Sequence, residues 1–97
     1  MNLTIVDFQP LVGETFDIPH HESGEVYTRL ALREVSPIGK PHAGRAEPFS
    51  LKFEGPRVTP LNQNTYLLRH QTLGDNYIFI VPIAESGDIR EYEAIFN

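Results

Sequence analysis

Hydrophobic and polar residues alternate along much of the chain. The alternation covers residues 14–18, a longer segment from 25 to 35, and residues 49–54. A period of two is typical of β-strands that bury one face, so three strands are predicted over these segments. Val35 is out of phase with Leu32, which indicates either a bulge or the end of the second strand.

The last third of the chain predicts two hairpins. Residues 65–70 are expected to pair with residues 76–83 around a turn at 72–75. Residues 76–83 are then expected to pair with residues 89–96 around a turn at 85–88. Each turn contains a glycine, which adopts the positive φ angles that tight turns require.

Six short strands separated by turn residues predict a mainly β domain, a small antiparallel six-stranded barrel or sandwich. The chain has 97 residues, 40% of them hydrophobic, so residues 1–97 are interpreted as a single domain with one core. It contains no cysteine, and its stability must therefore come from packing. The side chains predicted to point inward are Phe16, Ile18, Leu30, Leu32, Phe49, Leu51, Phe53, Tyr66, Leu68, Tyr77, Phe79, Val81, Tyr92, Ala94 and Phe96.

Residues 1–13 predict a short helical segment ahead of the first strand. Thr4 and Asp7 have the spacing of a capping box, in which two side chains satisfy the free amides of a helix N-terminus. Pro10 limits the helix to one or two turns, because proline lacks a backbone donor. An extended arm is the alternative interpretation.

Residues 77–81 are apolar at every position, whereas a half-buried strand normally carries polar residues on its outer face. If the odd-numbered residues point inward, a second apolar face remains outside. Two explanations stay open: the N-terminal segment lies across this face, or the face binds a second subunit or another protein. The candidate interface consists of Leu67, Ile78, Ile80 and Ile95.

Residues 36–47 form a long loop, with two prolines and two glycines in twelve positions. Lys40, His42 and Arg45 concentrate basic groups on this loop. These three residues are candidate contacts for an acidic partner or a phosphate; the alternative is that they keep the loop solvated.

Net charge and hydropathy exclude some classes of partner. The formal charge is −5, with 13 acidic and 8 basic residues, whereas nucleic-acid-binding proteins usually present a dense basic surface. No nucleic-acid partner is therefore expected. Neither a signal peptide nor an apolar run of about 20 residues is visible, so no membrane contact and a cytoplasmic location are expected.

No sequence motif indicates catalysis, a cofactor or a metal site. His20 and His21 are adjacent, and neighbouring side chains of an extended chain point apart rather than toward one ion. His70 ends a predicted strand and is expected to hydrogen-bond to the neighbouring turn. An enzyme is favoured only if His70 or His42 meets a carboxylate in a cleft. No catalytic, cofactor-binding or metal-binding residue is predicted.

Six short motifs in the second half of the chain form a recognisable pattern. They are Pro48-Phe49-Ser50-Leu51, Phe53-x-Gly55-Pro56, Leu61-x-Gln63-x-Thr65-Tyr66-x-Leu68-x-His70, Leu73-Gly74, Phe79-x-Val81-Pro82 and Tyr92-Glu93-Ala94-x-Phe96-Asn97. With them, the chain from Asp7 onward resembles an uncharacterised family of small bacterial proteins, described as a domain of unknown function, and the chain ending is the most specific part of this resemblance. The resemblance implies association with phage-derived genes of the tail-collar type, and it assigns no catalytic residue.

The leading functional hypothesis is a structural or accessory interaction module that self-associates or docks to a protein partner, as part of a phage-tail-like or other bacterial multiprotein assembly. It could then reside in a phage-like particle as well as in the cytoplasm. The alternative is a barrel that binds a small molecule or a carbohydrate at a mouth formed by the 36–47 loop and residues such as Tyr27.

Overall fold

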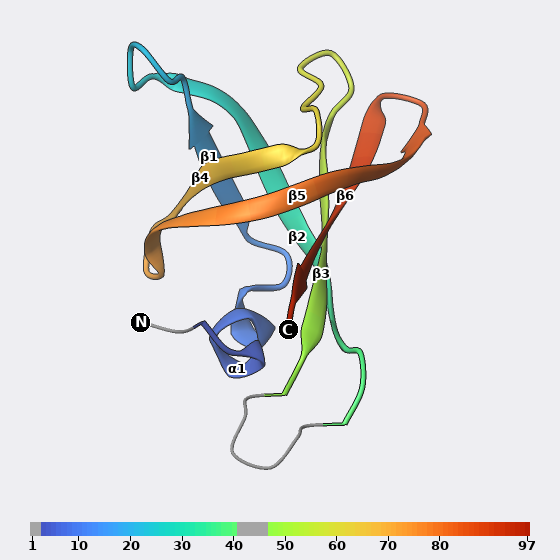
Figure 1. Ribbon diagram of the computed structural model, residues 1–97. Coiled ribbons are helices and arrows are strands. Elements are labelled where there is room, and N and C mark those ends of the chain that lie inside the picture. Colours follow the sequence, from blue (N-terminus) through green and yellow to red (C-terminus); the bar gives the residue numbers. More distant parts are fainter. Residues whose placement is uncertain (1–2, 41–46) are drawn as a thin grey trace.

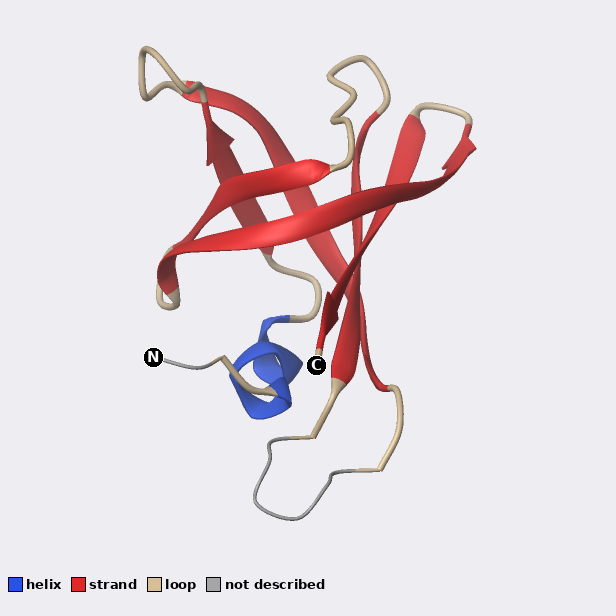
Figure 2. Ribbon diagram, in the orientation of Figure 1, coloured by secondary structure: helices blue, strands red, loops and turns tan. Residues whose placement is uncertain are grey.

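The chain folds as a closed antiparallel barrel with a short helical segment at one end (Figures 1 and 2). A computed structural model describes residues 3–40 and 47–97. Around the barrel the strands follow the order β1-β2-β3-β6-β5-β4, and β4 returns to β1. The predicted class is confirmed, and the architecture is a barrel rather than a sandwich. The elements are α1 (Ile5–Phe8), the 3-10 helix η1 (Gln9–Leu11), β1 (Thr15–Pro19), β2 (Val26–Pro37), β3 (Phe49–Pro56), β4 (Asn64–His70), β5 (Gly74–Ser86) and β6 (Ile89–Phe96).

The barrel interior is filled by aromatic and aliphatic side chains from all six strands. Phe16 and Phe53 meet edge to face, with ring centroids 5.5 Å apart. Tyr92 is fully buried, and its hydroxyl oxygen accepts a hydrogen bond from the Leu61 amide at 2.9 Å. The predicted phase break in the second strand is confirmed, since the β2–β3 register shifts between Leu32 and Glu34. The buried hydrophobic residues are Phe8, Leu11, Phe16, Ile18, Leu30, Leu32, Phe49, Leu51, Phe53, Leu61, Leu68, Ile78, Ile80, Tyr92 and Ala94.

The N-terminal segment closes the lower end of the barrel in Figure 1. The predicted capping box is present, with the Thr4 amide donating to Asp7 Oδ2 at 2.7 Å. Phe8 is fully buried, and its ring centroid lies 5.8 Å from that of Phe49 and 5.5 Å from that of Phe96. The segment therefore packs into the core through its apolar side chains. Of the two explanations left open for the outer face of residues 77–81, the one in which this segment lies across that face is therefore not supported.

The predicted facing of β5 is wrong. Ile78 and Ile80 are buried at 3% and 0% exposure, whereas Tyr77 and Phe79 are exposed at 76% and 51%. Val81 is only partly buried. In an antiparallel pair, a shift of one residue moves every side chain to the opposite face of the sheet.

The length of the β4–β5 turn explains this inversion. The sequence interpretation placed four residues, 72–75, in the turn. The structure instead pairs His70 with Gly74 and leaves three residues between them. This register places Leu68 opposite Asn76 and Tyr66 opposite Ile78, so the even-numbered residues of β5 point inward.

Candidate interaction surface

An apolar stripe lies on the outside of β5. Tyr77 is paired with Leu67 of β4, and Phe79 is paired with Thr65. Leu67 is half-buried, while the two aromatic side chains are mostly in solvent. We refer to Leu67, Tyr77 and Phe79 as the β5 stripe.

The β5 stripe replaces most of the interface predicted from sequence. Ile78 and Ile80 belong to the barrel core and cannot contact a partner in the folded protein. Ile95 is 54% exposed, but it lies on β6 and is paired with Ser50 of β3. Of the four predicted interface residues, Leu67 alone is paired directly with an exposed aromatic side chain of β5. The sequence signal, an apolar strand with two apolar faces, was correct, but the faces were interchanged.

The first half of β5 also has a free backbone edge. Residues 74–80 pair with β4 on one side. On the other side, β6 pairs with β5 from Val81 to Ser86 only, and no other described residue takes its place along 74–80. Figure 1 shows β5 and β6 diverging beyond their paired section. In an antiparallel strand, alternate residues direct their N–H and C=O groups to opposite sides, so part of this backbone lacks strand partners.

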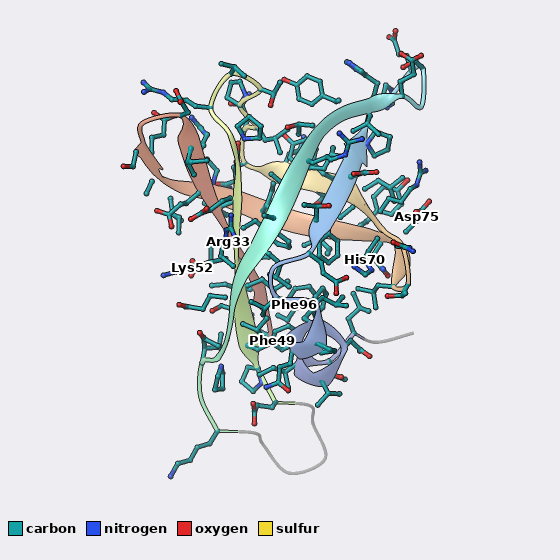
Figure 3. The ribbon with its side chains drawn as sticks, turned by 180° about the vertical axis from the view of Figure 1, so that it is seen from behind. Arg33, Phe49, Lys52, His70, Asp75 and Phe96 are labelled. Carbon is teal, nitrogen blue, oxygen red and sulfur yellow. The ribbon has the colours of Figure 1, made fainter. Side chains whose placement is uncertain are left out.

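The outer surface over β1, β2 and β3 is charged instead. Asp17 accepts a hydrogen bond from Arg29 at 2.9 Å, and Glu54 accepts one from Arg33 at 3.0 Å. Lys52 lies 3.8 Å from Glu34. Figure 3 shows Arg33 and Lys52 pointing away from the barrel. This surface is therefore suited to contact with water.

An ion pair marks the boundary between the charged surface and the β5 stripe. Arg69 of β4 donates two hydrogen bonds to the Asp75 carboxylate, at 2.9 and 3.3 Å. The hydrogen bonds and charge of Asp75 raise the pKa of Arg69 above its ordinary value. In the backbone, Arg69 of β4 lies opposite Asp17 of β1, and this single β1–β4 strand pair closes the barrel.

His70 is the last residue of β4 and hydrogen-bonds to the β4–β5 turn, as the sequence predicted. Its Nδ1 accepts hydrogen bonds from the amides of Thr72 and Leu73, both at 3.1 Å. Its Nε2 lies 2.7 Å from Glu14 Oε1. Because Nδ1 faces two amide donors, we assign the proton of the neutral imidazole to Nε2, which donates to Glu14. His70 thus links the turn to the start of β1 and holds the three-residue turn that sets the register of β5.

The His70–Glu14 contact does not form an acid–base pair of catalytic type. The sequence favours an enzyme only if His70 or His42 meets a carboxylate in a cleft, and the distance of 2.7 Å to Glu14 fulfils only the first part of that condition. However, a general base needs a ring nitrogen with a free lone pair, and the Nδ1 lone pair is already engaged by the turn. His70 is also 4% exposed and packs on Phe16, with ring centroids 4.8 Å apart. The geometry is that of a structural tie.

The remaining polar candidates do not converge on one site. His20 and His21 lie in the β1–β2 turn, beside an open hollow that Glu22 and Glu25 also line. The His20 ring meets Tyr27 edge-on at 5.0 Å. Within residues 3–40 and 47–97, no group of three or more His, Cys, Asp or Glu side chains is arranged to hold a metal ion.

The basic loop is only partly described. Ser36 and Pro37, the first two residues of the predicted 36–47 loop, belong to β2 instead, and Lys40 is exposed. His42 and Arg45 lie outside the described residues, so their predicted contacts remain a prediction. None of the helices in the described part of the chain has the length and apolar character needed to cross a bilayer.

Fold and surface together define a class: a closed six-stranded antiparallel barrel whose distinctive external feature is an apolar strand with a free edge. Residues 3–96 match the model of a domain of unknown function, DUF6916, and the chain belongs to that family. No curated protein and no solved structure matches the chain.

Proposed function

We propose that this protein is a structural or accessory interaction module that binds a protein surface through the β5 stripe and the adjacent edge of β5. The supporting observation is the exposure of Tyr77 and Phe79, at 76% and 51%, on a barrel that already has a filled core. These aromatic side chains are not needed to complete the core. Aromatic residues are also enriched among those that contribute most to protein–protein binding.

The energetics of the surface support this proposal. Burying an aromatic side chain is worth roughly 1.5–3 kcal/mol, and two neighbouring ones supply a hydrophobic centre for an interface. The paired charges Arg69 and Asp75 lie at one end of the stripe, where a polar rim would form. Leu67 extends the apolar surface across β4.

We further propose that the module belongs to a phage-tail-like or other bacterial multiprotein assembly, in a phage-like particle or in the cytoplasm. The support for this setting is the sequence resemblance alone, since the match to a domain of unknown function over residues 3–96 assigns neither an activity nor a setting. A small, closed barrel with one apolar strand is a suitable building block for such an assembly, because a rigid scaffold presents its contact residues at low entropic cost.

The alternative function, binding of a small molecule or a carbohydrate, has weaker support. Tyr27 lies at the start of β2 (Val26–Pro37) and the 36–47 loop begins at its other end, so the two predicted parts of one mouth are at opposite ends of that strand. The interior is filled as well, because Phe16, Phe53 and Tyr92 are fully buried or nearly so. A thermal-shift screen over sugars and small metabolites tests this alternative, and a stabilising ligand class would favour it.

Site-specific photo-crosslinking tests the proposed function. A photoreactive amino acid at Phe79 should capture one reproducible protein in the native cell, and the complex should re-form from the two purified proteins. The same amino acid at Val58, which is 88% exposed and outside β5, is the matched control. Equal capture at the two positions, or no capture at Phe79, would refute a docking role for the β5 stripe.

A further inference from the structure

We propose that the partner of the β5 stripe is a second copy of this chain, joined by antiparallel pairing of residues 74–80 with the same segment around a two-fold axis at Tyr77. This inference rests on the proposed function and identifies its partner. It follows from three properties of the segment: a free backbone edge, the absence of lysine, proline or a bulge along that edge, and a length that is centred on Tyr77, the more exposed of its two outward aromatic residues.

The free edge determines the kind of partner. Unpaired N–H and C=O groups along an extended strand are completed by another extended strand, and no helix or folded surface satisfies them in the same regular way. The aromatic side chains of Tyr77 and Phe79 lie on the same seven-residue segment as these groups. A partner strand can therefore form backbone hydrogen bonds and cover aromatic surface at the same time.

The segment lacks the features by which proteins usually protect strand edges. Such edges typically carry lysine, proline or a bulge that prevents pairing with another chain. Residues 74–80 contain neither lysine nor proline, and the register of this section with β4 is uninterrupted. The single charged residue of the segment, Asp75, is paired with Arg69 of the same chain. Pro82 and the register shift between Pro82 and Ala84 occur only in the section of β5 that β6 already covers. This distribution is expected if the free section is normally paired.

The length of the segment favours a second copy. Pairing around Tyr77 places Gly74 opposite Ile80 of the second copy, so both free edges are used from end to end without reaching the section occupied by β6. A register shifted toward the C-terminus would place this edge against Val81, which is already paired with Glu93. Closed two-fold contacts of this isologous kind are the commonest in homo-oligomers.

The side chains and charges of the segment also permit self-pairing. The two Tyr77 residues would lie directly opposite each other, with their Cα atoms about 4.5–5.5 Å apart. Aromatic cross-strand pairs of this kind stabilise sheets. Asp75 would lie opposite Phe79 of the second copy, and its charge is balanced by Arg69 of its own chain. Two copies can thus approach at this edge although each chain has a formal charge of −5.

Mass measurement over a wide concentration range is the first test. Size-exclusion chromatography with light scattering should show the mass rising from that of one chain toward that of two. Tyr77→Lys should keep the chain monomeric, because it places a charge at the axis, while its urea midpoint should equal that of the wild type at concentrations where the wild type is monomeric. Val58→Lys, at a highly exposed position outside β5, should dimerise as the wild type does.

Disulfide trapping tests the axis. The chain has no cysteine, so Tyr77→Cys creates a single thiol, and pairing around residue 77 brings two such thiols within bonding distance. Under mild oxidation this variant should form covalent dimers at least tenfold faster than Val58→Cys. Equal rates, or a wild-type chain that stays monomeric at all concentrations, would overturn the inference. The proposed function survives that result if a photoreactive residue at Phe79 still captures a different protein, and it fails with the inference if nothing is captured.

Discussion

On the β2–β3 side and on the β5 side of this barrel the inward residues are alike, most of them apolar, whereas the outward residues differ. Over β2 and β3, inward Leu32 and Phe53 alternate with outward Arg33 and Glu54. The two outward residues form a solvent-exposed ion pair. Over β5, inward Ile78 and Ile80 alternate with outward aromatic residues. The core requirement is therefore satisfied on both sides, and only the outer residues distinguish them.

This difference shows where the protein departs from what folding alone requires. A solvated barrel is stable with polar outer residues, as β2 and β3 show, so the aromatic residues of β5 are not explained by the fold. The free edge of residues 74–80 coincides with the same strand. Two departures at one place indicate a binding surface more strongly than either one separately.

The largest expected effect comes from reversing inside and outside on β5. Ile80→Glu places a carboxylate in the barrel core and should lower the free energy of unfolding by more than about 4 kcal/mol, which is enough to unfold a marginally stable domain. Phe79→Glu, one residue away, should change it by less than about 1.5 kcal/mol, since half of its side chain is already in solvent. Urea denaturation followed by circular dichroism measures both variants.

The outcome discriminates between the two possible registers of β5. If Ile80→Glu folds normally while Phe79→Glu unfolds, the odd-numbered residues form the core and the β5 stripe does not exist. Equal and small effects would mean that this strand is not part of the core at all.

The next effect tests the residue that fixes this register. His70→Ala removes the acceptor for the Thr72 and Leu73 amides and leaves a space against Phe16, so we expect a loss of about 3 kcal/mol in the free energy of unfolding. Glu14→Gln is the matched control. It keeps an oxygen that accepts from Nε2 and should cost less than about 1 kcal/mol. A His70→Ala variant as stable as Glu14→Gln would show that the turn does not depend on the imidazole.

The sequence predicted the strands well and the facing of one strand poorly, and His70 explains why. Period-two patterns are sharp in residues 14–18 and 49–54, because polar and apolar residues alternate there, and those strands formed as predicted. Residues 77–81 have no such contrast, so their facing depends on the turn length. The length of the β4–β5 turn is set by hydrogen bonds from its amides to the His70 ring. No local sequence pattern reveals these bonds.

The sequence therefore predicted that this strand carries an apolar outer surface, but it did not predict which residues form that surface. The absence of polar positions in residues 77–81 correctly indicated exposed apolar surface on this strand. The role of the N-terminal segment depended on long-range packing of Phe8 among Phe49 and Phe96, which periodicity does not encode. The free edge of residues 74–80 results from the divergence of β5 and β6, a feature of the closed barrel rather than of either strand.

A smaller effect on stability is expected from the ionisation of the buried Tyr92, with the exposed Tyr77 as the comparison. Burial raises the pKa of Tyr92, although the hydrogen bond from the Leu61 amide opposes this. The folded state therefore holds this proton more tightly than the unfolded state. The resulting stability is complete below the ordinary tyrosine pKa of about 10 and is lost as the pH rises from there through the folded-state pKa.

Tyrosine-to-phenylalanine variants measure this contribution. Tyr92→Phe should lower the free energy of unfolding by about 1 kcal/mol at pH 7, through the lost acceptor for Leu61, and should flatten its decline above about pH 10. Tyr77→Phe, on the β5 stripe, should alter neither quantity. An alkaline decline as steep in Tyr92→Phe as in the wild type would assign the effect to other groups.

The smallest effect belongs to the charged side of the barrel. A double-mutant cycle of Arg33→Ala and Glu54→Ala should give a coupling free energy of about 0.2–1 kcal/mol, because both side chains are in contact with solvent. The coupling should shrink further in 1 M salt, where charges are screened over about 3 Å. A coupling above about 2 kcal/mol that persists in salt would mean that these charges hold the barrel together. The lack of charged residues at positions 77 and 79 on the outside of β5 would then have a structural cost, and the aromatic residues there would be a compensation rather than a sign of binding.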